Sequence, residues 1–130
     1  MNTFSLTFTA QPQHIDELDH VNNAVWVQWL QELSVAHWQA AADPAHVDRY
    51  FWVIVRHEID YRGNIALGEQ AVGRTWVPGT PKGARFARHA VFSDAQGKAI
   101  VSAISTWAML DKVTGRPARV TSDIVAAFQD

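Results

Sequence analysis

One long amphipathic helix, placed after a single strand and before a run of strands, is the dominant pattern of this sequence. Between residues 23 and 41, the side chains expected on one helix face recur every three or four positions. They are Trp26, Trp29, Leu30, Leu33, Ala36, His37 and Ala40. Asn22 or Asn23 caps the start, and Asp43-Pro44 ends the segment because proline disfavours helical backbone in the residue before it. We therefore predict a helix over residues 23–41.

Most of the remaining chain has the period of two that is typical of strands. Residues 3–9 alternate apolar and hydroxyl side chains, and residues 51–61 alternate as well. In the second segment one face is expected to carry Phe51, Val53, Val55, His57, Ile59 and Tyr61. Turn-forming residues then delimit strands near 69–77, 84–93 and 99–111, with successive hairpins as the simplest connection. Thr121 or Ser122 is expected to cap a short terminal helix that runs through Phe128.

This order of elements predicts an α+β domain in which one apolar helix packs on one face of an antiparallel sheet. Residues 1–130 show no linker and no repeat, so we expect a single domain. The chain offers no second long helix for the other face of the sheet. A homo-oligomer is the simplest way to cover that face.

Composition excludes several classes of function. Eleven basic residues against thirteen acidic ones give a net charge of −2, so the positive field of a nucleic-acid-binding protein is missing. The absence of cysteine excludes disulfides, thiol nucleophiles and metal sites built on sulfur. The histidines lack paired spacing on a helix face, and we predict no metal and no cofactor. Without a signal peptide or a long apolar run, we expect a cytoplasmic protein that makes no membrane contact.

Acidic and amide side chains are concentrated directly before the helix, in His14-Ile15-Asp16-Glu17-Leu18-Asp19-His20-Val21-Asn22-Asn23. The free N–H groups and the dipole of a helix start favour an anion or a polarised carbonyl oxygen. One interpretation is therefore an oxyanion site beside a reactive carboxylate. The other is purely structural: Asn22 and Asn23 cap the helix, while Asp16 and Asp19 complement its dipole.

The order of these residues resembles the hot-dog-fold acyl-CoA thioesterases of the 4-hydroxybenzoyl-CoA thioesterase type. The resemblance rests on His20-Val21-Asn22-Asn23, on Asp16 four residues before the histidine, and on Trp26 at the usual tyrosine position. Residues 57–62 look like the long central strand of that family. The resemblance implies a five-stranded antiparallel sheet wrapped around the long helix, and a homodimer or homotetramer with active sites at the subunit interface. It also implies hydrolysis of an acyl-CoA thioester.

By the same resemblance, Asp16 attacks the thioester carbonyl or activates a water, and both roles suit a carboxylate. The carbonyl oxygen would be held by the backbone N–H of Asn23. His20 is either a substrate contact or a structural turn residue. Related acyl-carrier-protein thioesterases pair this histidine with an asparagine two residues earlier, where the present chain has Leu18. Asp19 stands where the family usually has glycine, and aspartate tolerates a positive φ better than most residues.

Substrate contacts are predicted for Asn22, Trp26, Tyr61, Lys82, Arg85 and Arg88. The three cations suit the phosphates of coenzyme A, with a solvated strand edge as the alternative. Arg85 and Arg88 have opposite parity in their strand, so only one of them is expected to face the ligand.

Two aromatic positions have a structural alternative of the same kind. Tyr61 lines the pantetheine channel or serves in packing. Trp26, together with Trp29 and Trp38, shapes the acyl pocket or belongs to the core.

The function predicted from the sequence is hydrolysis of an acyl-CoA. One alternative is the same chemistry on acyl groups carried by an acyl-carrier protein. Because that carrier is acidic, the net charge of −2 favours coenzyme A. The other alternative is a non-catalytic protein that binds acyl thioesters, and Asp16 argues against it since a pure binder would not need a reactive carboxylate.

Overall fold

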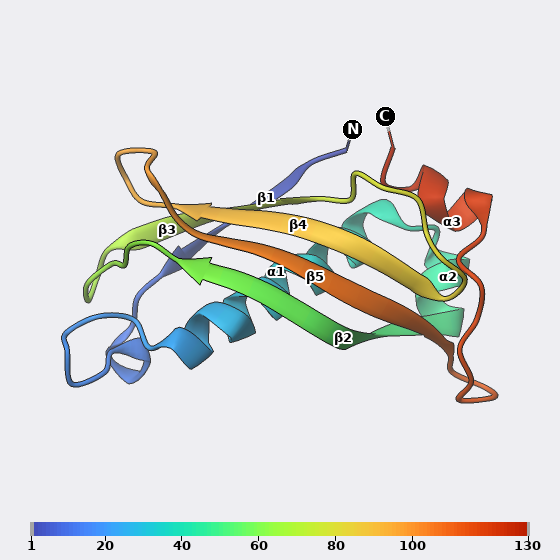
Figure 1. Ribbon diagram of the computed structural model, residues 1–130, viewed down its shortest axis with the longest axis horizontal. Helices are drawn as coiled ribbons and strands as arrows, with labels where there is room; N and C mark the ends of the chain where they lie inside the picture. Colours follow the sequence, from blue (N-terminus) through green and yellow to red (C-terminus); the bar gives the residue numbers. More distant parts are fainter. Residues whose placement is uncertain (1, 130) are drawn as a thin grey trace.

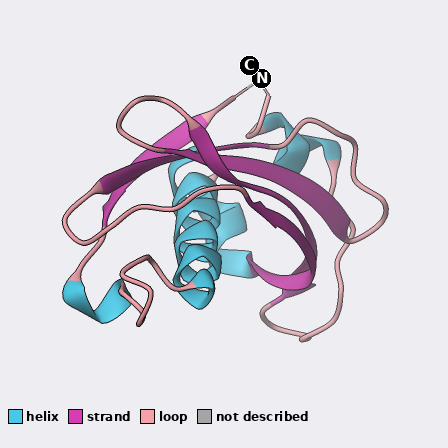
Figure 2. Cartoon of the chain, turned by 60° about the vertical axis from the view of Figure 1, so that its left-hand side comes forward, coloured by secondary structure: helices cyan, strands magenta, loops and turns pink. Residues whose placement is uncertain are grey.

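Helix α1 (Asn23–Ala41) lies on the concave side of a curved sheet in the computed structural model, which describes residues 2–129 (Figure 2). The sheet is antiparallel throughout, with the strand order β1-β3-β4-β5-β2. Its strands are β1 (Phe4–Thr9), β2 (Tyr50–Tyr61), β3 (Gln70–Trp76), β4 (Arg85–Ser93) and β5 (Ala99–Asp111) (Figure 1). The predicted α+β class, with a five-stranded antiparallel sheet around one long helix, is confirmed.

Three short helices complete the chain: η1 (Pro12–His14), α2 (Pro44–Arg49) and α3 (Ser122–Ala126). Helix α3 was expected, whereas η1 and α2 were not. Asp43-Pro44 ends α1 as predicted and also starts α2, because the Asp43 side chain accepts a hydrogen bond from the Ala45 N–H at 2.9 Å. Proline in the first turn suits this start, since its missing N–H would have no helical partner there.

The prediction of successive hairpins is only partly right. Strands β3, β4 and β5 do follow one another as hairpins, but β2 pairs with β5 and β3 pairs with β1. The segment between β2 and β3 therefore carries the chain from the edge strand β2 to β3, which lies next to the opposite edge strand, β1. As a result β2, which has twelve residues, is an edge strand of the described sheet.

Strand β2 also departs from the single unbroken alternation expected over residues 51–61. Its register with β5 shifts between Ile54 and Arg56, which leaves Val55 as a bulge residue. Before the bulge, Trp52 and Ile54 are partly buried, and after it His57 is partly buried and its ring forms a hydrogen bond with Ser105 of β5. The predicted common face of β2 is therefore wrong at its first three positions: Phe51, Val53 and Val55 are exposed at 38%, 37% and 44%.

The core divides into two apolar clusters along α1. One surrounds the first half of the helix, with Trp29, Leu30 and Phe92 among its members, and the other surrounds Trp38 and Phe128. Gly73 of β3 allows the sheet to approach the helix closely, since a Cβ there would lie 2.8 Å from the Phe92 ring. The buried residues of the described chain also include polar and charged ones: Ser34, His37, Thr75, Arg88, Ser105 and Asp111.

Within the described residues, no helix is long and apolar enough to cross a membrane.

Candidate active site

Residues 14–22 form a closed loop directly before α1. The N–H of Asp16 donates to the His20 carbonyl at 2.9 Å, and the N–H of Asn22 donates to the His14 carbonyl at 3.0 Å. These bonds flank a bridge between Ile15 and Val21. Asp16 therefore lies opposite His20, next to the start of the helix, and the loop brings together the residues predicted from the sequence.

The loop is anchored by the segment between β2 and β3, which the sequence did not single out. The Asn64 side-chain amide donates to the Val21 carbonyl at 3.0 Å, and the Val21 N–H donates to the Ile65 carbonyl at 3.3 Å. Only the turn signal of Gly63-Asn64 pointed to this segment. Asn64 is therefore a positioning residue for the loop rather than a group that faces it.

Backbone strain in the loop is concentrated at Asp19. It has a φ of 62°, in the left-handed region that favours glycine, and no other non-glycine residue of the described chain has a positive φ. Asp19 thus adopts a backbone conformation that favours glycine, the residue usual at this position in the family that the sequence resembles. The unusual residue does not open the loop, because the Asp19 N–H still donates to the Asp16 carbonyl at 3.1 Å.

The Asp16 carboxylate is held by one oxygen and free at the other. Its Oδ1 accepts a hydrogen bond from the Leu18 N–H at 2.9 Å, which fixes the side chain in an Asx turn. Within residues 2–129, Oδ2 has no hydrogen-bond partner, and the side chain is only half-buried. An ionised carboxylate with one fixed and one free oxygen can accept a proton or attack a carbonyl carbon.

The first N–H of α1 is a free donor. Asn22 caps the helix by accepting from the Ala24 N–H at 2.9 Å, and its carbonyl accepts from the Val25 N–H at 2.9 Å. The Asn23 N–H has no acceptor among the described residues, and Asn23 is exposed. A free donor at the positive end of a helix dipole can stabilise an oxyanion.

Tyr61, at the end of β2, lies next to the start of α1. Its hydroxyl donates to the Asn23 carbonyl at 3.4 Å, and partial burial raises the pKa of the phenol. Five of the predicted site residues therefore lie at one end of the molecule: Asp16, His20, Asn22, Asn23 and Tyr61.

The other predicted residues lie elsewhere. Trp26 is a core residue with 1% exposure, packed edge-on against Trp29 and Phe92, so its position fits the structural alternative. Lys82 and Arg85 are exposed and close the turn between β3 and β4, at the end of the sheet far from Asp16 (Figure 1). A phosphate contact from either one to a ligand at Asp16 of the same chain would have to cross about 20 Å, the length of β3.

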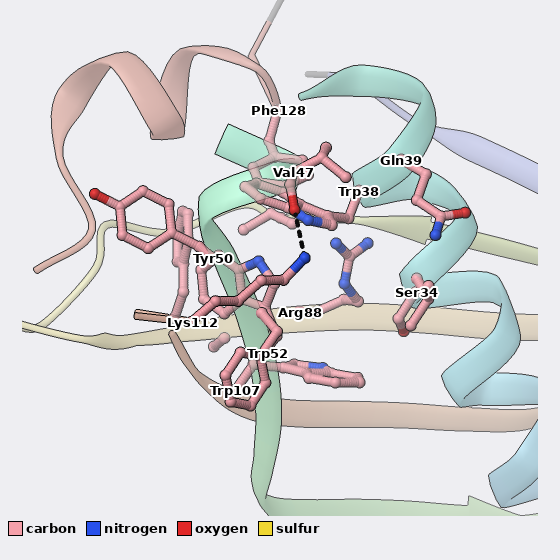
Figure 3. Close-up of a pocket in the computed structure, with 15 residues that line it drawn as sticks. Ser34, Trp38, Gln39, Val47, Tyr50, Trp52, Arg88, Trp107, Lys112 and Phe128 are labelled. Atoms are coloured by element: carbon pink, nitrogen blue, oxygen red, sulfur yellow. Dashed lines mark hydrogen bonds between the residues drawn. The ribbon is translucent and has the colours of Figure 1, made fainter. Parts of the chain in front are cut away.

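Arg88 lies on the buried face of β4 and is only 7% exposed. A role at the solvated phosphates of coenzyme A does not fit this position, and that prediction is corrected here. The expected difference in parity between Arg85 and Arg88 is present, because Arg85 is exposed on the opposite face. Arg88 instead lines a cavity between the sheet and the second half of α1 (Figure 3).

That cavity has a volume of about 200 Å³. Its walls include Trp38, Tyr50, Trp52, Trp107 and Phe128. It lies beside Ser34, eleven residues along α1 from Asn23, which corresponds to about 16 Å at 1.5 Å per residue. The cavity and the Asp16 loop are therefore separate in one chain. Among residues 2–129, no group of three histidine or acidic side chains is arranged to hold a metal ion.

The acyl-ACP thioesterase N-terminal domain family matches residues 2–128, so the chain belongs to this family of thioesterases. A search of curated protein sequences gave no match. The predicted membership of a thioesterase family is thus confirmed, while the finer assignment to the 4-hydroxybenzoyl-CoA type stays a prediction.

Solved structures of thioesterases share the fold. An acyl-ACP thioesterase from Bacteroides thetaiotaomicron is 27% identical with a TM-score of 0.83; the match covers 98% of this chain and 54% of that one. The chain thus spans about half the length of this relative. A thioesterase from Thermus thermophilus, complexed with coenzyme A and Zn, is 20% identical with a TM-score of 0.83 and coverage of 97% of both chains. A 1,4-dihydroxy-2-naphthoyl-CoA thioesterase from Synechocystis is 13% identical with a TM-score of 0.82; the match covers 99% of this chain and 97% of that one.

Proposed function

We propose that this protein hydrolyses an acyl-CoA thioester, with Asp16 as the base or nucleophile and the Asn23 N–H as the oxyanion donor. The observation that carries the proposal is the presence of two free groups, one in the loop before α1 and one at the first residue of α1. The Asp16 Oδ2 and the Asn23 N–H both lack partners among the described residues, and hydrogen bonds across the loop, from Asp16 to His20 and from Asn22 to His14, hold the loop next to the start of α1. Attack on a thioester needs a carboxylate on one side of the carbonyl and a donor on its oxygen.

The remaining residues of the loop have supporting roles in this proposal. His20 and Asn22 contact the substrate at the rim, and Tyr61 borders the channel at the end of β2. We also propose that the protein is located in the cytoplasm.

A second copy of the chain completes the site in this proposal. Strand β2 is an unpaired edge, and an exposed edge strand of twelve residues is a template for pairing. Two β2 edges that pair antiparallel across a twofold axis place the Tyr50 end of one copy beside the Tyr61 end of the other. Since Tyr50 lines the cavity and Tyr61 touches Asn23, the cavity of one protomer then faces the Asp16 loop of its partner.

The same pairing brings the turn that carries Lys82 and Arg85 to the end of the assembly where the partner's Asp16 loop lies. The two cations can then meet the phosphates of coenzyme A, which a single chain does not permit. Light scattering tests this arrangement, and a stable monomer would refute it.

The acyl-carrier-protein alternative is favoured by the name of the matching family, whereas coenzyme A is favoured by the net charge of −2 and by the ligand of the Thermus relative. Release of free thiol should therefore be measured with matched acyl-CoA and acyl-carrier-protein thioesters. A higher kcat/KM with the acyl-carrier-protein thioester would identify that thioester, rather than the acyl-CoA, as the substrate. Failure to turn over either would favour the non-catalytic binding protein.

Two substitutions test the chemistry. Asp16→Asn should lower kcat by about 10²-fold or more, the range for loss of a positioned base. Asp94→Asn is the matched control, because Asp94 forms a similar turn in the hairpin between β4 and β5, outside the Asp16 loop, through the Gln96 and Lys98 N–H groups. Equal turnover by Asp16→Asn and the wild type would exclude the proposed role.

The oxyanion donor can be removed by Asn23→Pro. Asn23 is the first helical residue, where proline is well tolerated, and Asn22 has φ −61° and ψ 142°, which a following proline permits. The substitution should keep the helix and lower kcat by about 10²-fold. Asn23→Ala keeps the N–H and should remain close to wild type.

A further inference from the structure

Arg88 is a buried cation without an acidic partner in the described chain. Its guanidinium points into the cavity from β4 (Figure 3), and the residue is only 7% exposed. Among residues 2–129, no carboxylate lies within salt-bridge distance of it. Buried charges are normally paired, because an unpaired one loses its hydration without replacement.

Only part of the guanidinium is satisfied within the described residues. Nη1 donates to Nδ1 of His37 at 2.8 Å and to Oγ1 of Thr75 at 3.1 Å, and the Phe128 ring lies 5.4 Å from the central carbon. Nε and Nη2 have no acceptor among the described residues, and Arg88 lines the cavity. Arg88 therefore presents donors in the fork geometry that matches a carboxylate.

Apart from Arg88, Ser34, Gln39 and Lys112, the lining of the cavity is apolar and aromatic, and it contains no Asp or Glu. Its volume of about 200 Å³ exceeds the ~150 Å³ of an engineered apolar cavity that binds benzene. A single ring or a short alkyl chain with one polar end fits such a space. Lys112 at the rim adds a second cation, with its Nζ bonded to the Val47 carbonyl at 3.0 Å.

We propose that this cavity binds the far end of the acyl group and that Arg88 selects acyl groups ending in a carboxylate. The assignment to an acyl group rests on the proposed thioesterase function, whereas the binding of a carboxylate at Arg88 does not. The same chemistry would be met by a free carboxylic acid, such as the product of hydrolysis. The experiment therefore separates these two sources.

The test compares matched substrates on the wild-type protein and on Arg88→Met. CoA monothioesters of dicarboxylic acids are paired with the simple acyl-CoAs of the same chain length, over about six to twelve carbons. In at least one pair we expect kcat/KM for the carboxylate-ended substrate to exceed that for the simple acyl-CoA by about tenfold or more. This ratio corresponds to the free energy of one hydrogen bond to a charged group. Arg88→Met should abolish that preference, because it should lower kcat/KM for the carboxylate-ended substrate by more than for the simple acyl-CoA of the same length.

Arg74→Met is the matched control, because Arg74 is exposed on the opposite face of the neighbouring strand. It should leave the preference unchanged. If Arg88→Met fails to fold, the comparison of paired substrates on the wild type still decides, since it requires no variant.

Calorimetric binding of octanedioate, octanoate and octanol provides the second measurement. If turnover shows no preference but both acids bind in an Arg88-dependent manner and octanol does not, the site is upheld and its ligand is a free acid. If the wild type prefers the uncharged acyl group at every length and binds acids no better than octanol, the proposal is overturned. Failure to cleave any thioester would refute the proposed function alone, and the binding data would then decide this inference.

Discussion

The protonation of His37 should control the stability of this domain below about pH 6.5. His37 is fully buried, and Nδ1 accepts from Arg88 while Nε2 donates to Oδ1 of Asn2 at 2.8 Å. Arginine can only donate, so the neutral ring must carry its hydrogen on Nε2. Burial, and second the charge of Arg88, lower the pKa of His37 to about 4. Protonation at Nδ1 would place two donors face to face.

The direction and size of the effect follow from this pKa. Because the folded state favours neutral His37, its stabilisation is complete above the unfolded pKa of 6.5 and is lost as the pH falls toward 4. The difference corresponds to about 3 kcal/mol, at about 1.4 kcal/mol per pH unit. About 1.4 kcal/mol of it should be lost by about pH 5.5. The full loss of about 3 kcal/mol is a large part of the roughly 5–15 kcal/mol by which a typical domain is stable against unfolding.

Urea unfolding between about pH 7.5 and 4.5 measures this loss directly. His37→Asn is the informative variant, since its side-chain oxygen can still accept from Arg88 but does not titrate. It should be less stable at neutral pH, because a cavity replaces the ring, and should lose about 2 kcal/mol less on acidification. Parallel stability curves for the variant and the wild type across this range would refute the reasoning.

Three further substitutions test the local geometry by thermal or urea unfolding. Asp19→Val should destabilise the protein by about 1–2 kcal/mol, because a β-branched residue resists the positive φ of 62°. Asp19→Gly should leave the stability close to that of the wild type. Equal stability of the two variants would contradict the inference that the backbone is strained at this position. Gly73→Ala should cost about 1–3 kcal/mol because its Cβ would meet Phe92 at 2.8 Å and Leu33 at 3.0 Å; an unchanged midpoint would show that the core can yield there. Asn22→Ala should cost about 1 kcal/mol through loss of the cap to Ala24. A smaller loss of stability than for Asp43→Ala, which removes the cap of the shorter helix α2, would argue against this.

Local signals were enough to predict the main elements. The spacing of Trp26, Trp29 and Leu33, with an asparagine before and Asp43-Pro44 after, gave the bounds of α1 as the structure has them. Strand β2 was harder because both of its faces are apolar between residues 51 and 55. An extra residue there changes no local pattern, and only the pairing with β5 reveals Val55 as a bulge.

The candidate site likewise has residues that the sequence could predict and residues that only the folded structure reveals. Asp16, Asn22 and Asn23 lie within eight positions of one another, so a sequence pattern can place them in one loop. The anchoring by Asn64 and the burial of Arg88 depend on strands that meet only in the folded sheet. Parity did separate Arg85 from Arg88, but it did not say which face of β4 is covered. For that reason the sequence predicted that one of the two arginines faces the ligand but not which one.

His37 and Arg88 couple the stability of the domain to the proposed ligand. A bound carboxylate would offset the charge of Arg88, which is the second cause of the lowered pKa of His37, while burial of the ring would remain. The pKa of His37 should therefore rise when octanedioate is bound, and by linkage the acid should bind more tightly as the pH falls.

Saturating ligand adds stability at every pH, so the slope of stability between about pH 5.5 and 4.5, where the folded-state pKa of His37 has its effect, is the quantity to compare. We expect a shallower slope in the presence of octanedioate, and no change of slope with octanol. Identical slopes with and without the bound acid would mean that its carboxylate does not lie at Arg88.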